Sequence, residues 1–95
     1  MRVEYNPHVS RDAEEIFRHY EKVSTALAHG FMHDLGLVIA KAAENPLRFH
    51  VARHFRRANP RRFPYHVLYR ILVDGIRVVV VRHNKRHPRY GITRA

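Results

Sequence analysis

The chain has 95 residues, no cysteine and a formal net charge of +10. This length is expected to form one domain over residues 1–95, and the lack of cysteine excludes disulfides, zinc–thiolate sites and thiol catalysis. Residues 1–47 hold five Lys or Arg and seven Asp or Glu, whereas residues 48–95 hold thirteen Lys or Arg and one acid, Asp74. The second half is therefore expected to face an anionic partner.

The apolar pattern indicates a folded protein outside the membrane. Hydrophobic residues make up 45% of the chain, an ordinary fraction for a globular domain. No apolar run approaches the roughly 18–20 residues of a membrane-spanning helix, and the N-terminus lacks the apolar core of a signal peptide. We expect a cytoplasmic protein without a membrane partner.

The first half predicts a strand and two helices. Residues 2–5 alternate as a strand that stops at Asn6-Pro7. Ser10 is a candidate N-cap for the first helix, and the second helix is predicted to start at Ser24 or Thr25 and to end at Asn45-Pro46. The apolar stripes are Ala13, Ile16, Phe17, Tyr20 and Val23, then Leu27, Phe31, Leu35, Val38 and Ala42. The short link between them predicts an antiparallel helical hairpin.

Residues 47–63 carry a weaker pattern, because Pro60 interrupts their apolar positions. We expect a loop that leads into a strand, with Pro60 at an edge or a bulge.

The pair Asp74-Gly75 lies between two runs rich in β-branched residues and predicts a two-residue hairpin turn. In that register Val73 faces Ile76 and Tyr69 faces Val80, on an apolar side that packs on the helices. The other side is expected to lie open or to be covered by a partner, and it carries His66, Arg70, Arg77 and His83. The order of elements predicts an α+β fold.

Basic residues cluster before and after this hairpin. Guanidinium groups suit phosphate or carboxylate recognition, and neighbouring tyrosines can stack on bases. The clusters are Arg56, Arg57, Arg61 and Arg62, with Tyr65 beside them, and Arg82, Lys85, Arg86, Arg89 and Arg94, with Tyr90. Anion or acidic-protein binding is the interpretation that the charge asymmetry favours; a solvated basic surface is the alternative.

Histidine chemistry is the other candidate. His29/His33 and His50/His54 have metal-ligand spacing but lack a third ligand, so no metal or other cofactor is expected. His66 opposite His83 could serve general acid–base chemistry on a phosphodiester, against the alternative of a packed surface pair.

A motif of basic, aromatic and proline residues runs along the second half. It consists of Arg61, Arg62, Phe63, Pro64, Tyr65 and Tyr69, then His83, Arg86 and Pro88. In the order and spacing of these residues, and along nearly its whole length, the chain resembles the RelE/ParE superfamily of bacterial type II toxins, in particular its ParE-like branch. The resemblance implies a β-α-α-β-β-β fold and a growth-inhibiting toxin that is neutralised by an acidic antitoxin, in a homodimer or a toxin–antitoxin hetero-oligomer.

The resemblance leaves two targets open. ParE-like members inhibit DNA gyrase, whereas RelE-like members cut mRNA on the ribosome without a metal. His66 stands where the nuclease branch often has Arg, and Arg86-His87-Pro88 stands where the ParE-like ending usually reads Arg-Asp-Pro. The motif favours the ParE-like side.

Each hypothesis assigns its own residues. A binding toxin would contact its target or antitoxin through Arg61, Arg62, Tyr65, Arg70, Arg77, Arg82, Lys85, Arg86 and Arg89. A nuclease would use His66, His83, Arg86 and Tyr90. A plain nucleic-acid-binding module is the third hypothesis, because a net charge of +10 favours weak DNA binding at low salt.

Overall fold

The computed structural model describes residues 1–94 and has two helices, a short 3-10 helix and five strands. In chain order these are β1 (Arg2–Tyr5), α1 (Val9–Glu21), α2 (Thr25–Glu44), η1 (Pro46–Arg48), β2 (His50–Ala52), β3 (Phe55–Ala58), β4 (Tyr65–Leu72) and β5 (Gly75–His83). No helix within residues 1–94 is long and apolar enough to cross a bilayer.

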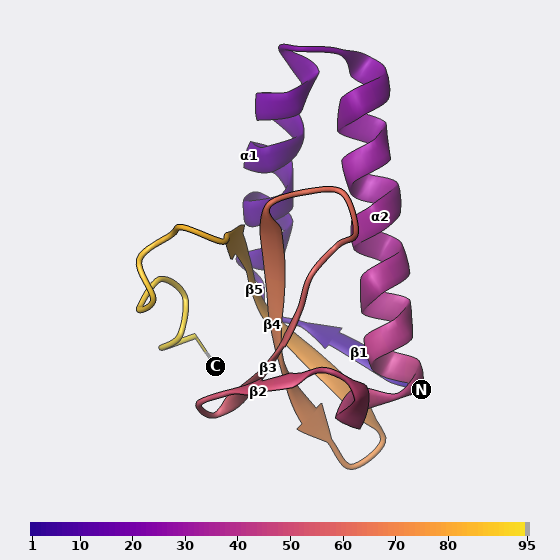
Figure 1. Ribbon diagram of the computed structural model, residues 1–95. Helices are drawn as coiled ribbons and strands as arrows, with labels where there is room; N and C mark the ends of the chain where they lie inside the picture. Colours follow the sequence, from indigo (N-terminus) through magenta and orange to yellow (C-terminus); the bar gives the residue numbers. More distant parts are fainter. Residues whose placement is uncertain (95) are drawn as a thin grey trace.

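The strands form one sheet in the order β1-β5-β4-β3-β2. β1 runs parallel to β5 and the other neighbours are antiparallel. The hairpin of α1 and α2 packs on one face of this sheet (Figure 1). The α+β prediction is therefore confirmed, as is the β-α-α-β-β-β arrangement, to which the structure adds one short strand after the helices.

The helix starts follow from local hydrogen bonds. Ser24 caps α2, because its hydroxyl accepts a hydrogen bond from the Leu27 amide at 2.9 Å. The prediction of Ser10 as the cap of α1 is wrong: α1 already begins at Val9 after a turn in which the Asn6 side chain accepts a hydrogen bond from the His8 amide. No side chain caps α1: His8 is its N-cap residue, and Asn6 forms the turn that precedes it.

The hairpin of β2 and β3 was not predicted for residues 47–63. Its strands have three and four residues, too few for alternation to be distinguished from a loop. It turns at Arg53, whose φ of 59° is left-handed and usually marks glycine in a sequence. Pro60 follows β3 in the loop that leads to β4 and is buried there, rather than at a sheet edge.

The predicted register of the main hairpin is wrong. Its loop is Val73-Asp74, and Gly75 is already the first residue of β5, paired with Leu72. Gly75 also pairs with Arg2, and a β-carbon at Gly75 would lie 1.8 Å from the Arg2 carbonyl oxygen. The glycine is required because β1 approaches so closely, rather than because the chain turns there.

A bulge shifts the register again between Leu68 and Tyr69 and leaves Val79 as the extra residue of β5. Val78 and Val81 therefore face the helices, whereas Val79 and Val80 pack on the opposite face. A straight strand would have alternated through all four valines, which is why alternation misassigned the residues after the bulge.

Replacement of Gly75 by alanine is expected to lower the free energy of unfolding by about 2 kcal/mol or more, because β1 must move off the sheet edge. Urea unfolding measures this loss. Gly36→Ala is the control: it lies inside α2 with no atom within 4 Å of the new β-carbon, so it should stabilise by about 1 kcal/mol. Equal effects of the two substitutions would contradict the role given to Gly75.

Candidate functional site

The sheet face opposite the helices is covered by the chain's own C-terminal segment. Phe55, Leu68, Val79 and Val80 form a small apolar cluster there, and Tyr90 and Ile92 pack against it. Figure 1 shows residues 84–94 folded back beside the sheet, away from α2. The expectation of a face that lies open or is covered by a partner is corrected: within the described residues much of it is closed from inside the molecule.

His66 is buried under this segment, with 1% of its surface exposed. Its Nε2 accepts a hydrogen bond from Arg82 Nε at 2.8 Å, so the ring proton is assigned to Nδ1, which lies 2.9 Å from the Asn84 side-chain oxygen. The pKa of His66 is lowered to about 4, chiefly by burial and to a lesser extent by the nearby Arg57 and Arg82, against the opposing effect of the hydrogen bond to Asn84. His66 is thus neutral at physiological pH.

His83 does not face His66. It pairs with Tyr65 on the helix side of the sheet, with the two ring centroids 5.0 Å apart, because the bulge shifts the end of β5. His66 pairs with Arg82 instead. The predicted pair of histidines is therefore wrong.

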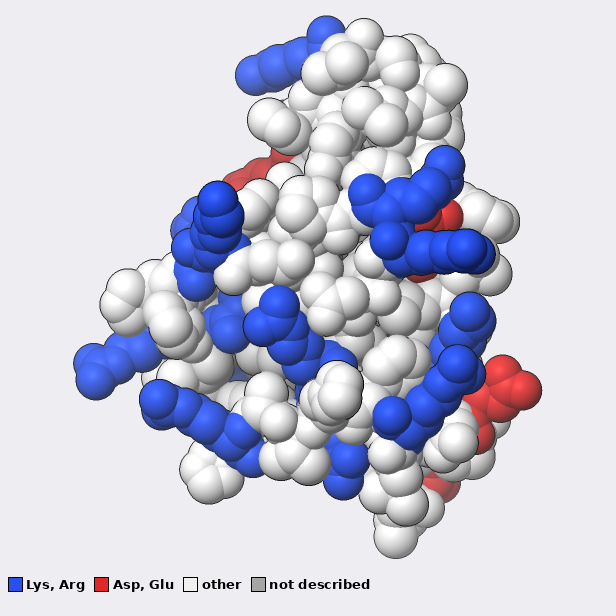
Figure 2. All heavy atoms as spheres, in the orientation of Figure 1, with Lys and Arg blue, Asp and Glu red and all other residues white. Residues whose placement is uncertain are grey.

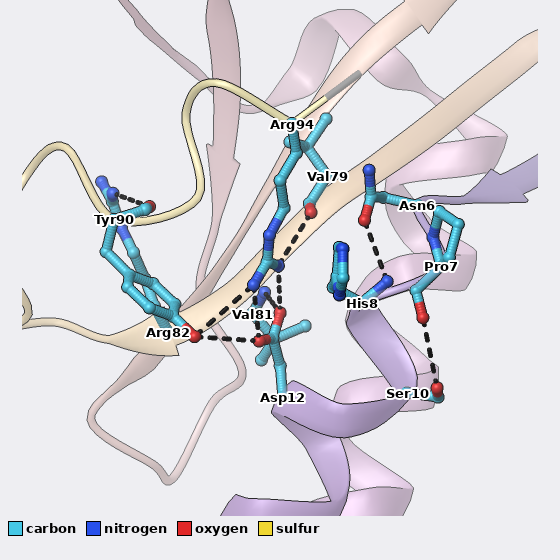
Figure 3. Close-up of polar contacts among 10 residues, drawn as sticks. All are labelled: Asn6, Pro7, His8, Ser10, Asp12, Val79, Val81, Arg82, Tyr90 and Arg94. Atoms are coloured by element: carbon cyan, nitrogen blue, oxygen red, sulfur yellow. Dashed lines mark hydrogen bonds and ion pairs between the residues drawn. The ribbon is translucent and has the colours of Figure 1, made fainter.

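Arg82 clamps the C-terminal segment. Besides its bond to His66, the guanidinium donates to the carbonyl oxygens of Pro88 and Tyr90, both at 2.8 Å. Figure 3 shows the contact between Arg82 and Tyr90. With these acceptors in place, Arg82 positions the segment and is not presented as a free cation for a partner.

Asp12 and Arg94 form the second clamp. Arg94 donates to both carboxylate oxygens of Asp12, at 2.6 and 3.1 Å, and to the Val79 carbonyl at 3.2 Å. Asp12 also accepts from the Val81 amide at 3.1 Å, and the Tyr90 hydroxyl lies 3.5 Å from it. Figure 3 shows Asp12 on α1 facing Arg94 and Tyr90. Sequence reasoning missed this pair, since nothing local marks two residues 82 positions apart.

The loop between β5 and Tyr90 carries the exposed cations Lys85, Arg86 and Arg89. Two local hydrogen bonds shape it: the His83 ring accepts from the Lys85 amide, and the His87 ring accepts from the Arg89 amide. We call residues 84–89 the basic loop. It borders a cleft of about 240 Å³ against α1, lined among others by Glu15, His19, His83, Arg86 and Tyr90.

Arg86 and Tyr90 form the outer wall of that cleft. The Arg86 guanidinium lies 4.0 Å from the centre of the Tyr90 ring, a cation–π contact. The ring is therefore occupied from outside by Arg86 and from inside by the apolar cluster.

Most other predicted contact residues have structural partners. Arg62 holds Asp34 at 2.9 and 3.2 Å, Arg77 bonds Glu4 at 3.1 Å, and Arg70 lies over the Phe55 ring. Tyr65 packs in the core beside Tyr20 and Phe31. Arg61 is exposed and lines a pocket with residues of α2 that contains no residue of the basic loop.

No group of three potential metal ligands occurs within residues 1–94. The described site is thus made of cations, aromatic rings and one buried carboxylate.

The arrangement of a helical hairpin on this sheet is shared with a solved structure, the chromosomal ParDE toxin–antitoxin system from P. aeruginosa. The TM-score is 0.74 at 15% sequence identity, over 87% of this chain and 95% of that chain. A comparison with curated proteins returned no match.

Residues 3–88 match the family described as ParE toxin of type II toxin-antitoxin system, parDE. The chain therefore belongs to the ParE toxin family, which confirms the resemblance to the ParE-like branch of the RelE/ParE superfamily.

The pKa of His66 predicts a pH-dependent stability. Because the folded pKa is below the unfolded value of about 6.5, stability is full above that pH and is lost as the pH falls toward 4. The loss between about pH 7 and pH 5 should be about 2 kcal/mol, a range above the titration of ordinary carboxylates.

Urea unfolding across this range measures the loss. His66→Gln removes the titration and should flatten the profile, whereas His54→Gln, at an exposed turn, should leave it unchanged. A profile that keeps its slope in His66→Gln would refute the assignment.

Removal of the Arg94 charge should release the C-terminal segment. Arg94→Met leaves the Asp12 carboxylate buried without its partner and is expected to lower stability by about 3 kcal/mol. Amide hydrogen exchange should accelerate in residues 84–94 before the rest of the sheet opens. If those amides stay as protected as in the unaltered chain, the clamp is not what holds the segment.

Proposed function

We propose that this toxin arrests bacterial growth in the cytoplasm by binding a protein target, DNA gyrase, through its basic loop, and that an acidic antitoxin neutralises it. Family membership supports a toxin of a toxin–antitoxin system. The observation that carries the choice of a binding mechanism is the C-terminal segment over the sheet, because it buries His66, one of the residues that cleavage would use, and leaves cations outside.

His66 gives the clearest argument against cleavage at the sheet. A general acid or base must reach the proton that it transfers and must titrate near the working pH. Both ring nitrogens of His66 are occupied by Arg82 and Asn84, and its pKa is about 4. His66 therefore supports structure rather than catalysis.

The basic loop fits recognition of an acidic protein surface. Lys85 and Arg89 are exposed and have no carboxylate partner within residues 1–94. The loop backbone is held by the clamp of Arg82 and by bonds to the two histidine rings, so little ordering is required on binding. Charges placed this way increase association rates and select an oppositely charged partner.

A second candidate function rests on the cleft beside α1. It brings His83, Arg86 and Tyr90 together next to Glu15 and His19, a set that includes three of the residues predicted for RNA cleavage. A ribosome-dependent endonuclease would use this cleft, with Arg86 stabilising charge on the phosphate.

Induced expression of the intact chain should stop bacterial growth, and co-expression of the cognate antitoxin should restore it. The purified chain should inhibit gyrase supercoiling, and Lys85→Ala/Arg89→Ala should weaken that inhibition about tenfold because two contact cations are lost. Arg11→Ala/Lys22→Ala removes equal charge from the exposed surface of the first half and should have no such effect.

Primer extension on translated messages separates the two candidates. New 5′ ends with normal supercoiling would establish the endonuclease and reject gyrase binding. Normal growth at confirmed expression would refute the toxin proposal altogether.

A further inference from the structure

A second basic region lies beside α2 and is made of residues outside the basic loop. Figure 2 shows Lys and Arg atoms on this side of the molecule as well as on the opposite side, with acidic atoms among those beside α2. A pocket of about 360 Å³ opens there between α2, η1 and the loop that joins β3 to β4. We call it the α2 pocket; it is lined by His33, Asp34, Leu37, Val38, Lys41, Arg48, Phe49, Asn59, Arg61 and Arg62.

The charge of the α2 pocket is unbalanced. Its one carboxylate, Asp34, is held by the Arg62 guanidinium through two bonds of 2.9 and 3.2 Å, which lower the pKa of Asp34. Lys41, Arg48 and Arg61 have no carboxylate partner among residues 1–94. Three cations therefore surround an opening whose single acid is already neutralised.

The walls of the pocket include apolar side chains. Leu37 is 49% exposed, and Val38 and Phe49 line the pocket with it. Together these three side chains place an apolar surface beside Lys41, Arg48 and Arg61. The combination suits a ligand with both a negative charge and an apolar group.

The wall formed by η1 and Phe49 is fixed in place. Tyr69 donates from its hydroxyl to the Pro46 carbonyl at 2.6 Å, and Arg56 donates to the Phe49 carbonyl at 2.9 Å. The facing wall is held by the pair of Arg62 and Asp34. A preformed site of this kind loses little conformational entropy when a ligand enters.

We propose that the α2 pocket binds an acidic peptide segment, with an apolar side chain inserted against Leu37 and Phe49 and carboxylates at Lys41, Arg48 and Arg61. The natural source of this peptide is the antitoxin, and only that part of the proposal rests on the proposed function. The pocket adjoins the basic loop, because the Asn59 side chain donates to the Asn84 side-chain oxygen at 3.2 Å, but no residue of the loop lines it. The antitoxin peptide and the target therefore use different cations.

Nucleic acid fits the α2 pocket less well. Single strands bind along grooves where cations follow the backbone and aromatic faces stack on successive bases. Phe49 is the only Phe, Tyr or Trp in the described lining, and the Arg48 guanidinium already lies 5.8 Å from the centre of its ring. The site offers one enclosed apolar position rather than a row of stacking surfaces.

The test uses the intact chain labelled with ¹⁵N and a short peptide that repeats Asp-Glu-Leu. Amide shifts on titration should be largest at Leu37, Lys41, Phe49 and Arg61. A peptide that repeats Asp-Glu-Ser has the same charge and should bind at least about tenfold more weakly, because the apolar contact is lost. Shifts that centre on residues 84–89, or equal binding of the two peptides, would overturn the proposal.

Two double variants that remove equal charge distinguish binding at the pocket from a general effect of net charge. Arg48→Ala/Arg61→Ala should weaken peptide binding about tenfold or more, whereas Lys85→Ala/Arg89→Ala removes the same charge and should leave it unchanged. All four side chains are exposed, so folding should be retained. Tighter binding of a single-stranded oligonucleotide in the same pocket would replace the peptide as ligand and refute the proposal.

Growth assays keep the two proposals distinct. Arg48→Ala/Arg61→Ala should still arrest growth but should no longer be rescued by the antitoxin. If the unaltered chain binds the peptide in the pocket but does not arrest growth, the toxin function is refuted and the pocket proposal stands. If Arg48→Ala/Arg61→Ala arrests growth and is fully rescued by the antitoxin, the pocket proposal is refuted and the toxin function stands.

Discussion

The carboxylate of Asp12 connects helix α1 with strand β5 and with the C-terminal segment, and the rest of the structure depends on this connection. It projects from α1, accepts a hydrogen bond from the Val81 amide of β5 and accepts two more from the Arg94 guanidinium. A buried carboxylate is tolerated only when its oxygens are satisfied, and here they are shared between a strand and the C-terminal segment. The helical layer, the sheet and the covering segment are thereby joined at one point, and the exterior position of the basic loop follows from it.

The two helices and the long hairpin could be predicted because each has a clear period and a clear boundary. Ser24 and Pro46 mark the ends of α2, and the β-branched runs mark β4 and β5. The register could not, because Val78–Val81 reads equally well in either alignment, and the bulge at Val79 leaves no mark in a run of identical residues. Gly75 was explained by a turn when its neighbour in space, Arg2, is remote in sequence.

The candidate site was harder to predict than the fold for the same reason. Charge counting correctly indicated a basic second half, but it could not say which cations stay free. Arg82 and Arg94 are used inside the molecule, and His66, which alternation placed on a solvated face, is covered by a segment far along the chain. Lys85, Arg89 and Arg61 remain outside. Local periodicity predicts which residues share a face of a helix or strand, but it does not predict whether a distant segment of the chain covers that face.

The parallel pairing of β1 with β5 has a consequence for how the toxin is made. The first strand can join its neighbour only after residues 75–78 have been synthesised, and Asp12 can meet Arg94 only after residue 94 has been synthesised. Contacts between such distant positions are slow to form, because a long loop must close first. A partly synthesised chain therefore lacks both its edge strand and the segment that orders the basic loop. The basic loop therefore takes its final position only after contacts between the first and the last described elements have formed.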